Sequence, residues 1–167
     1  MNHSVIVMGV CACGKTTFGR RLAKRVGVEY IDGDDLHPES NVKKMASGEA
    51  LDDSDREPWL ASIRHELRTA AAAKKPVVIS CSALKKSYRD LIRQGDPDLR
   101  FVFLNADRAL ILERIRRRRD HFMKDTLVDS QFSILEPPDG EPATIVLDAS
   151  RPADTLVDDF LASPLMR

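Results

Sequence analysis

A stretch near the N-terminus combines glycines, a lysine and a threonine at a spacing that suits phosphate binding. Residues 9–16 read Gly-Val-Cys-Ala-Cys-Gly-Lys-Thr, between an apolar run and an amphipathic segment. A leading glycine lets successive backbone N–H groups turn toward a phosphate, and a helix that begins at Gly14 adds its positive dipole end. Lys15 can then reach the β- and γ-phosphates, and the Thr16 hydroxyl can bind Mg²⁺. The residues expected at the phosphates of a nucleotide are Gly9, Val10, Cys11, Ala12, Cys13, Gly14, Lys15, Thr16 and Thr17.

Two carboxylates stand at the end of the next strand-like run. Asp32 and Asp34 flank Gly33, and residues beyond the carboxyl end of a strand in a doubly wound sheet face the ligand crevice. One carboxylate could hold the water shell of a metal ion, and the other could take a proton from a substrate hydroxyl. The sequence does not give distances, so the two roles could be exchanged. An acidic turn without a functional role is the alternative, because Asp and Gly both favour turns.

Strand-like and helix-like segments alternate along the chain, which predicts an α/β fold with a parallel sheet between layers of helices. One helix carries Trp59 on its apolar stripe and Pro58 in its first turn. We expect Trp59 to pack in the core rather than to stack on a substrate. The expected strands are residues 4–8, 28–31, 76–81, 101–104 and 144–147, and the other expected helices follow Gly14, end near Met45 and open near Pro152.

Composition sets broad limits on function. The chain has 167 residues, enough for one domain spanning 1–167, and its formal net charge is zero. Without a positive balance, nucleic acid is not an expected partner. No apolar run approaches the roughly 20 residues of a membrane-spanning helix, so no membrane is expected either. Three cysteines without a disulfide-dense pattern are typical of a reducing cytoplasm, where we expect this protein.

Beyond the phosphate loop, the sequence resembles the gluconate kinases over nearly its whole length. The most specific stretches are Asp-Gly-Asp-Asp-Leu-His-Pro at 32–38 and Cys-Ser-Ala-Leu-Lys at 81–85. Other matching positions are Asn41, Lys44, Met45, Gly48, Leu51, Asp53, Asp55, Arg56, Pro58, Trp59, Leu60, Tyr88, Arg89, Asp90, His121, Phe122, Ser130, Gln131, Phe132, Leu135 and Glu136.

The resemblance implies an ATP:D-gluconate 6-phosphotransferase that uses ATP and Mg²⁺ and feeds 6-phosphogluconate into central carbon metabolism. It also implies a three-layer P-loop kinase fold, related to the shikimate and nucleoside-monophosphate kinases, with a five-stranded parallel sheet in the order 2-3-1-4-5. A substrate-binding segment at about 35–70, a helical lid at about 108–136 and a homodimer complete the implied organisation.

Roles for particular residues follow from this resemblance. Asp34 is the expected base for the gluconate 6-hydroxyl, and Asp32 is expected to support Mg²⁺ beside Thr16. Arg56 can bind the substrate carboxylate in two-pronged fashion. His37 could instead start a helix without binding a ligand, and Lys85 and Arg89 could lie on a solvated helix face. The full set expected around the substrate is Asp34, His37, Lys44, Arg56, Ser82, Lys85 and Arg89.

The most basic part of the chain lies in the expected lid. Arg114 and Arg118 are four residues apart, hence on one helix face, and match lid arginines of the gluconate kinases. We expect both to close over the ATP phosphates and exclude water. Arg118 joins Lys15 and Asp34 as an expected catalytic residue. The arginines expected at the surface are Arg116, Arg117 and Arg119.

The phosphate loop departs from the family pattern, because Cys11-Ala12-Cys13 replaces the usual Ser-Gly-Ser. Ala12 limits the loop conformation more than glycine would. Cys13, at a helix N-terminus, is a candidate for oxidation that blocks ATP. Two other functions fit the motifs: a related kinase for shikimate or another polyhydroxy acid, and a regulatory protein that binds ATP without transferring phosphate.

Overall fold

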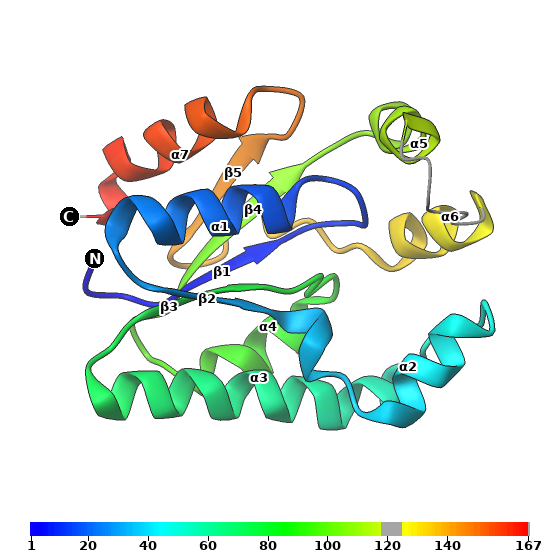
Figure 1. Cartoon of the computed structure of the whole chain (residues 1–167), viewed down its shortest axis with the longest axis horizontal. Coiled ribbons are helices and arrows are strands. Elements are labelled where there is room, and N and C mark those ends of the chain that lie inside the picture. Colours follow the sequence, from blue (N-terminus) through cyan, green and yellow to red (C-terminus); the bar gives the residue numbers. More distant parts are fainter. Residues whose placement is uncertain (118–124, 167) are drawn as a thin grey trace.

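The computed structural model describes residues 1–117 and 125–166, in which five parallel strands form one sheet (Figure 1). The strands are β1 (Val5–Met8), β2 (Glu29–Asp32), β3 (Val77–Ser80), β4 (Arg100–Asn105) and β5 (Thr144–Asp148). Their order is β2-β3-β1-β4-β5, so the first strand of the chain lies at the centre. The order and the parallel pairing confirm the fold class expected from the sequence.

Helices cover both faces of this sheet. They are α1 (Lys15–Val26), η1 (Gly33–Leu36), α2 (Glu39–Ala46), α3 (Asp53–Ala73), α4 (Lys86–Arg93), α5 (Arg108–Arg117), α6 (Asp125–Ile134), α7 (Ala153–Ala162) and η2 (Pro164–Met166). α1 and α7 pack on one face, and α3 and α4 pack on the other (Figure 1). α2, α5 and α6 lie beyond the carboxyl ends of the strands, where open parallel sheets bind ligands. Within the described residues, no helix is long and apolar enough to span a membrane.

The central strand β1 is buried on both faces, and its side chains alternate between two hydrophobic cores. Val5 and Val7 belong to a core that contains Phe18 of α1, while Ile6 and Met8 belong to a second core formed with α3 and α4. A continuous apolar run is what a strand covered on both sides requires. The phosphate loop therefore begins at the end of a strand that is held in place by packing on both of its faces.

The start of α3 differs from the sequence expectation, which placed Pro58 in the first turn. α3 begins at Asp53, so Pro58 lies in its second turn. Asp52 is the N-cap: its carboxylate accepts the Asp55 N–H at 2.9 Å, and the Asp55 carboxylate accepts the Asp52 N–H at 2.9 Å. This reciprocal capping box stabilises an earlier start than the proline indicates. The hydrogen bond from the Asp55 N–H lowers the pKa of Asp52 to about 2.

A buried ion pair joins α4 to the chain that returns from α6 to β5. Arg89 is 0% exposed. Its Nε donates to Glu141 Oε2 at 3.0 Å, and its Nη2 donates to Oε1 at 2.5 Å. The guanidinium also donates to the backbone carbonyls of Ala83, Leu84 and Glu136 at 2.9, 3.0 and 2.9 Å. Arg89 therefore ties the loop after β3 to the segment that follows α6.

Replacing Arg89 with methionine should lower the free energy of unfolding by about 3–5 kcal/mol, because Glu141 would keep only Arg93 as a cationic partner and three backbone carbonyls would lose their donor. Arg68→Met, at an exposed position of α3, is the matched control and should change it by less than about 0.5 kcal/mol. Urea denaturation of both variants measures the difference. Equal stability of the two variants would contradict an anchoring role for the ion pair.

Candidate functional site

The phosphate loop connects β1 to α1, and packing requires its first glycine. Gly9 has a φ of 142°, which other residues avoid, and a Cβ there would come within 2.8 Å of the Leu104 carbonyl oxygen. The Lys15 ammonium folds back over the loop and donates to the carbonyls of Gly9 at 3.1 Å and Val10 at 2.9 Å. The loop backbone and its lysine thus form one compact cationic turn.

The Asp32 carboxylate is the centre of a hydrogen-bond network beside this loop. Oδ2 accepts the Thr16 hydroxyl at 3.4 Å and the Tyr30 hydroxyl at 3.2 Å. Oδ1 accepts the Ser80 hydroxyl and the Asp34 N–H, both at 3.2 Å. Because Mg²⁺ takes oxygen ligands and keeps several waters, the adjacent oxygens of Thr16 and Asp32 could hold this ion, directly or through water.

Gly33 brings the two acidic residues against the end of β3. A Cβ on Gly33 would lie 2.2 Å from the Ser80 carbonyl oxygen, so only glycine fits this contact. On one side of it, Asp32 turns toward Thr16. On the other side, Asp34 is exposed and borders a pocket. The two carboxylates, interchangeable in the sequence, therefore have different surroundings in the structure.

The pocket beside Asp34 has a volume of about 260 Å³ and lies between the phosphate loop, η1, α3 and α6. Four of the seven residues expected around the substrate line it, namely Asp34, His37, Arg56 and Ser82. Cationic, acidic and hydroxyl groups therefore meet in one small space, which suits a polar, anionic molecule. The other lining residues are Cys11, Lys15, Met45, Glu49, Ala50, Leu51, Trp59, Leu127, Ser130 and Gln131.

Trp59 supports one wall of this pocket. Its side chain belongs to the second core at 1% exposure, which confirms the expected core packing, and its Nε1–H donates to the Gly33 carbonyl at 2.7 Å. The His37 ring stacks on the indole, with ring centroids 4.3 Å apart and 12° between the planes. Burial lowers the pKa of His37 below its ordinary value, so its imidazole is neutral at pH 7.

Three other cations expected at the substrate are held elsewhere, and none of them lines the pocket. Lys44 Nζ lies 2.7 Å from Asp55 Oδ2, and this hydrogen bond raises the pKa of Lys44. Lys85 Nζ donates to both carboxylate oxygens of Asp53, at 2.7 and 2.8 Å. Arg89 lies in the buried ion pair described above. Arg89 therefore faces neither the pocket nor the solvent, because its guanidinium N–H groups donate to Glu141 and to backbone carbonyls in the interior.

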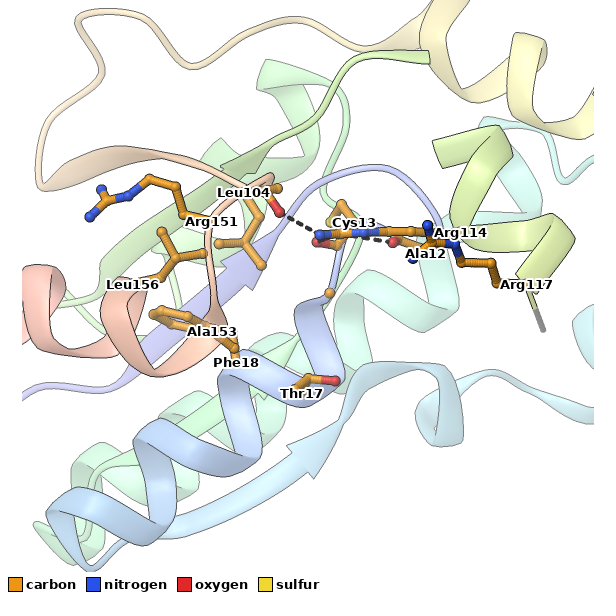
Figure 2. A pocket seen from close by; sticks show the side chains of 12 residues that line it. Ala12, Cys13, Thr17, Phe18, Leu104, Arg114, Arg117, Arg151, Ala153 and Leu156 are labelled. Carbon is orange, nitrogen blue, oxygen red and sulfur yellow. Dashed lines mark hydrogen bonds between the residues drawn. The ribbon is translucent and has the colours of Figure 1, made fainter. Parts of the chain in front are cut away.

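A second cavity, of about 240 Å³, lies on the other side of the phosphate loop (Figure 2). Phe18, Leu104 and Leu156 give it apolar walls, and Arg151 also lines it. The turn after β5 contributes to this cavity through Ala149. The remaining lining residues are Ala12, Cys13, Gly14, Thr17, Arg114, Arg117 and Ala153.

Arg114 of α5 lies directly against the phosphate loop, as Figure 2 shows. Its Nη1 donates to the Cys13 carbonyl at 2.8 Å, and its Nη2 donates to the Ala149 carbonyl at 2.5 Å. Arg117, expected at the surface, is exposed and also borders this cavity. Arg118 and Arg119 lie outside the described residues.

Gln131 of α6 is a site residue to which the sequence gave no role. Its side-chain oxygen accepts the Cys11 N–H at 2.6 Å, so α6 contacts the phosphate loop. Leu127 and Ser130 of the same helix border the pocket as well. The Ser-Gln-Phe stretch at 130–132 was the available signal, but an uncharged amide suggests no particular chemistry until its position is known.

Comparisons with known proteins agree on the family. A family model described as an AAA domain matches residues 5–138. The thermoresistant gluconokinase of Escherichia coli (strain K12) is 39% identical over 157 residues, which cover 93% of this chain and 90% of that protein. A gluconokinase from Sinorhizobium meliloti 1021 has a crystal structure that is similar at a TM-score of 0.88 and 42% identity, over 96% of this chain and 90% of that one. The chain belongs to the gluconokinase family.

More distant kinases share the fold of this gluconokinase-family chain. The crystal structure of a shikimate kinase from Aquifex aeolicus vf5 is similar at a TM-score of 0.60 and 15% identity, over 95% of this chain and 93% of that one. A likeness at this identity concerns the fold alone. The choice of substrate within such a fold depends on the side chains that line the pocket.

The phosphate loop of this family member stores strain at Ala12. Ala12 has a φ of 57°, in the left-handed region that alanine seldom adopts. Cys13 is 2% exposed and packs in the first core, which weighs against its oxidation. Cys81, after β3, is also buried, and burial raises its pKa to about 12.

Ala12→Gly should raise the free energy of unfolding by about 0.5–1 kcal/mol. The left-handed conformation costs alanine about 1–2 kcal/mol, which exceeds the extra entropy that glycine loses on folding. Ala61→Gly, at an exposed position inside α3, is the matched control and should lower stability by about 1 kcal/mol. Thermal denaturation compares the two, and a loss of stability at both positions would contradict the strain at Ala12.

Proposed function

We propose that this protein transfers the γ-phosphoryl group of ATP to the 6-hydroxyl group of D-gluconate. The observation that carries the proposal is that Lys15, Asp34 and Arg56 line one pocket beside the phosphate loop. A phosphate-binding ammonium, a carboxylate that can take a proton and a guanidinium that can bind a carboxylate are the groups this reaction needs. The similarity to gluconokinases over most of the chain supports the same substrate.

ATP would bind with its nucleoside in the cavity of Figure 2 and its phosphates along the loop. Ala12 and Cys13 border this cavity, whereas Cys11 and Lys15 border the pocket on the other side. The loop thus runs from the nucleoside side to the acceptor side. Such an arrangement supports transfer from a terminal phosphate to a molecule in the pocket.

Mg²⁺ would be held by Thr16 and, through water, by Asp32. No group of three or more His, Cys, Asp or Glu side chains gathers as a metal site in the part of the chain that the structure describes. Water and phosphate oxygens would therefore supply most ligands, as is usual for this ion. When bound, Mg²⁺ neutralises charge on the β- and γ-phosphate oxygens.

Asp34 would accept the proton of the gluconate 6-hydroxyl as the hydroxyl oxygen bonds to the γ-phosphorus and the bond to ADP breaks. Lys15 would stabilise the negative charge that spreads over the transferred group. Arg56 would hold the carboxylate at the other end of the substrate. Its Nη1 donates to the Tyr88 hydroxyl at 3.4 Å, and Tyr88 in turn donates to Asp53, so the guanidinium is oriented before substrate binds.

Residues 108–136 would form a lid over the nucleotide, and residues 35–70 would form the substrate-binding segment of a single domain spanning 1–167. The contacts of Arg114 and Gln131 with the phosphate loop support the lid. A phosphate oxygen would compete with Gln131 for the Cys11 N–H, so α6 would adjust when ATP binds. Arg118 would complete the lid as a phosphate ligand.

The proposal extends to the setting of the enzyme. We propose a cytoplasmic homodimer that supplies 6-phosphogluconate to carbohydrate metabolism and does not use nucleic acid or membranes as partners. The resemblance to gluconate kinases supports the dimer, and the zero formal net charge supports the absence of nucleic acid. Light scattering of the purified protein measures the oligomeric state.

The purified protein should release ADP with gluconate and Mg²⁺ at a rate at least about 100-fold above that with shikimate. In the proposed reaction, Arg56 and His37, which line the pocket, bind the carboxylate and a hydroxyl group of an acyclic polyhydroxy acid. A coupled assay measures ADP, and mass spectrometry identifies the phosphorylated product. Other sugar acids in the same assay test a related kinase. ATP binding without any phosphorylated product would favour a regulatory protein instead.

Asp34→Asn should lower kcat by about 10²–10⁴-fold, the usual contribution of a positioned general base. ATP binding, measured by calorimetry, should stay within about twofold, because Asp34 borders the acceptor pocket and not the nucleoside cavity. Asp35→Asn, at the next exposed position of η1, is the matched control and should keep its activity. Comparable turnover by the two variants would remove Asp34 from the base role.

A further inference from the structure

Asn41 of α2 is a buried polar residue to which the proposed reaction assigns nothing. Its side chain is 3% exposed, and its amide nitrogen has two contacts. Nδ2 donates to the backbone carbonyl of Asp55 at 2.7 Å, and it lies 3.2 Å from His37 Nδ1. A buried amide between two helices and a pocket histidine is costly unless its hydrogen bonds are made.

The carbonyl of Asp55 fixes the orientation of this amide. A backbone carbonyl can only accept a hydrogen bond, so the Asn41 atom that faces it must be the NH₂ group. The second hydrogen of the same NH₂ group then points to His37 Nδ1. This nitrogen must therefore carry a lone pair, and the proton of the neutral ring must reside on Nε2.

The surroundings of His37 agree with a neutral ring whose Nε2–H is available to a ligand. One face of the ring stacks on Trp59, and the ring borders the pocket. Burial has the largest effect on the pKa of His37 and lowers it. The charge of Asp34 in η1 raises this pKa, and the charge of Arg56 in α3 lowers it. Among the described residues no hydrogen-bond partner of Nε2 is present, whereas Nδ1 is held by Asn41.

We propose that Asn41 is a positioning residue that holds His37 in the Nε2–H tautomer, so that His37 donates a hydrogen bond to an oxygen of the polyhydroxy acid in the pocket. The inference rests on the proposed function for the identity of that acid. The tautomer itself depends only on the contacts within the protein. Asn41 thus acts on substrate binding through His37, without touching the substrate.

The tautomer can be measured directly in the full-length protein. Long-range ¹H–¹⁵N NMR distinguishes a protonated from an unprotonated imidazole nitrogen, and the spectrum of His37→Gln assigns the signals of His37 among the four histidines of the chain. At pH 7.5 the wild type should show a protonated Nε2 and an unprotonated Nδ1. A protonated Nδ1 would overturn the proposal.

Asn41→Leu keeps the size of the side chain and removes its NH₂ group. This variant should show a mixture of tautomers and a rise of about three- to tenfold in KM for gluconate, the effect of losing about one hydrogen bond. KM should change by a larger factor than kcat, and KM for ATP should be unaffected. Ser40→Ala, at an exposed position of the same helix, should match the wild type. An unchanged tautomer together with an unchanged KM would contradict the role of Asn41.

If Asn41→Leu does not fold, two variants of the histidine decide the matter. The amide of His37→Gln reaches about as far as Nε2 and can donate there, whereas that of His37→Asn ends near Nδ1. The KM for gluconate should therefore be lower for His37→Gln than for His37→Asn. A KM for His37→Gln that equals or exceeds that of His37→Asn would overturn the proposal. A wild type that shows the expected tautomer but does not phosphorylate gluconate would refute the proposed function and leave the Asn41–His37 pair standing.

Discussion

The hydrogen bonds of the Asp32 carboxylate are the interaction on which the arrangement of the site depends. They join the hydroxyls of Thr16, Tyr30 and Ser80 and the N–H of Asp34, which belong to four different elements. A charged acceptor shared by several donors holds each of them more firmly than a neutral one would. Through Asp32, the start of α1, the ends of β2 and β3, and η1 therefore keep fixed positions relative to one another.

Charge pairing divides the basic residues of the site region into two groups. Lys44 and Lys85 each hold a carboxylate at the start of α3, and Arg89 holds the segment that follows α6. Arg56 instead contacts the Tyr88 hydroxyl and borders the pocket. The first group fixes the walls of the pocket, while Arg56 is the cation that binds the substrate carboxylate in the proposed mechanism.

The expected lid is linked to the phosphate loop from both sides. Arg114 of α5 donates to a loop carbonyl, and Gln131 of α6 accepts a loop N–H. The same short loop therefore presents acceptors to one helix and a donor to the other. Because nucleotide phosphates need these N–H groups, ATP binding and the position of α6 are coupled in the proposed mechanism.

The sequence by itself determined the phosphate loop, the parallel sheet with its central first strand, the family, and the acidic pair at Asp32 and Asp34. These depend on local patterns, such as a glycine spacing or an apolar run, that fold in the same way in many chains. Only the tertiary structure decided which cations face the pocket, and it brought Gln131 and Asn41 into the site. The reason is that the position of each of these residues depends on an ion pair or hydrogen bond with a residue that is distant in the sequence. Lys85 meets Asp53, and Gln131 meets Cys11, over separations in the sequence that no spacing rule covers.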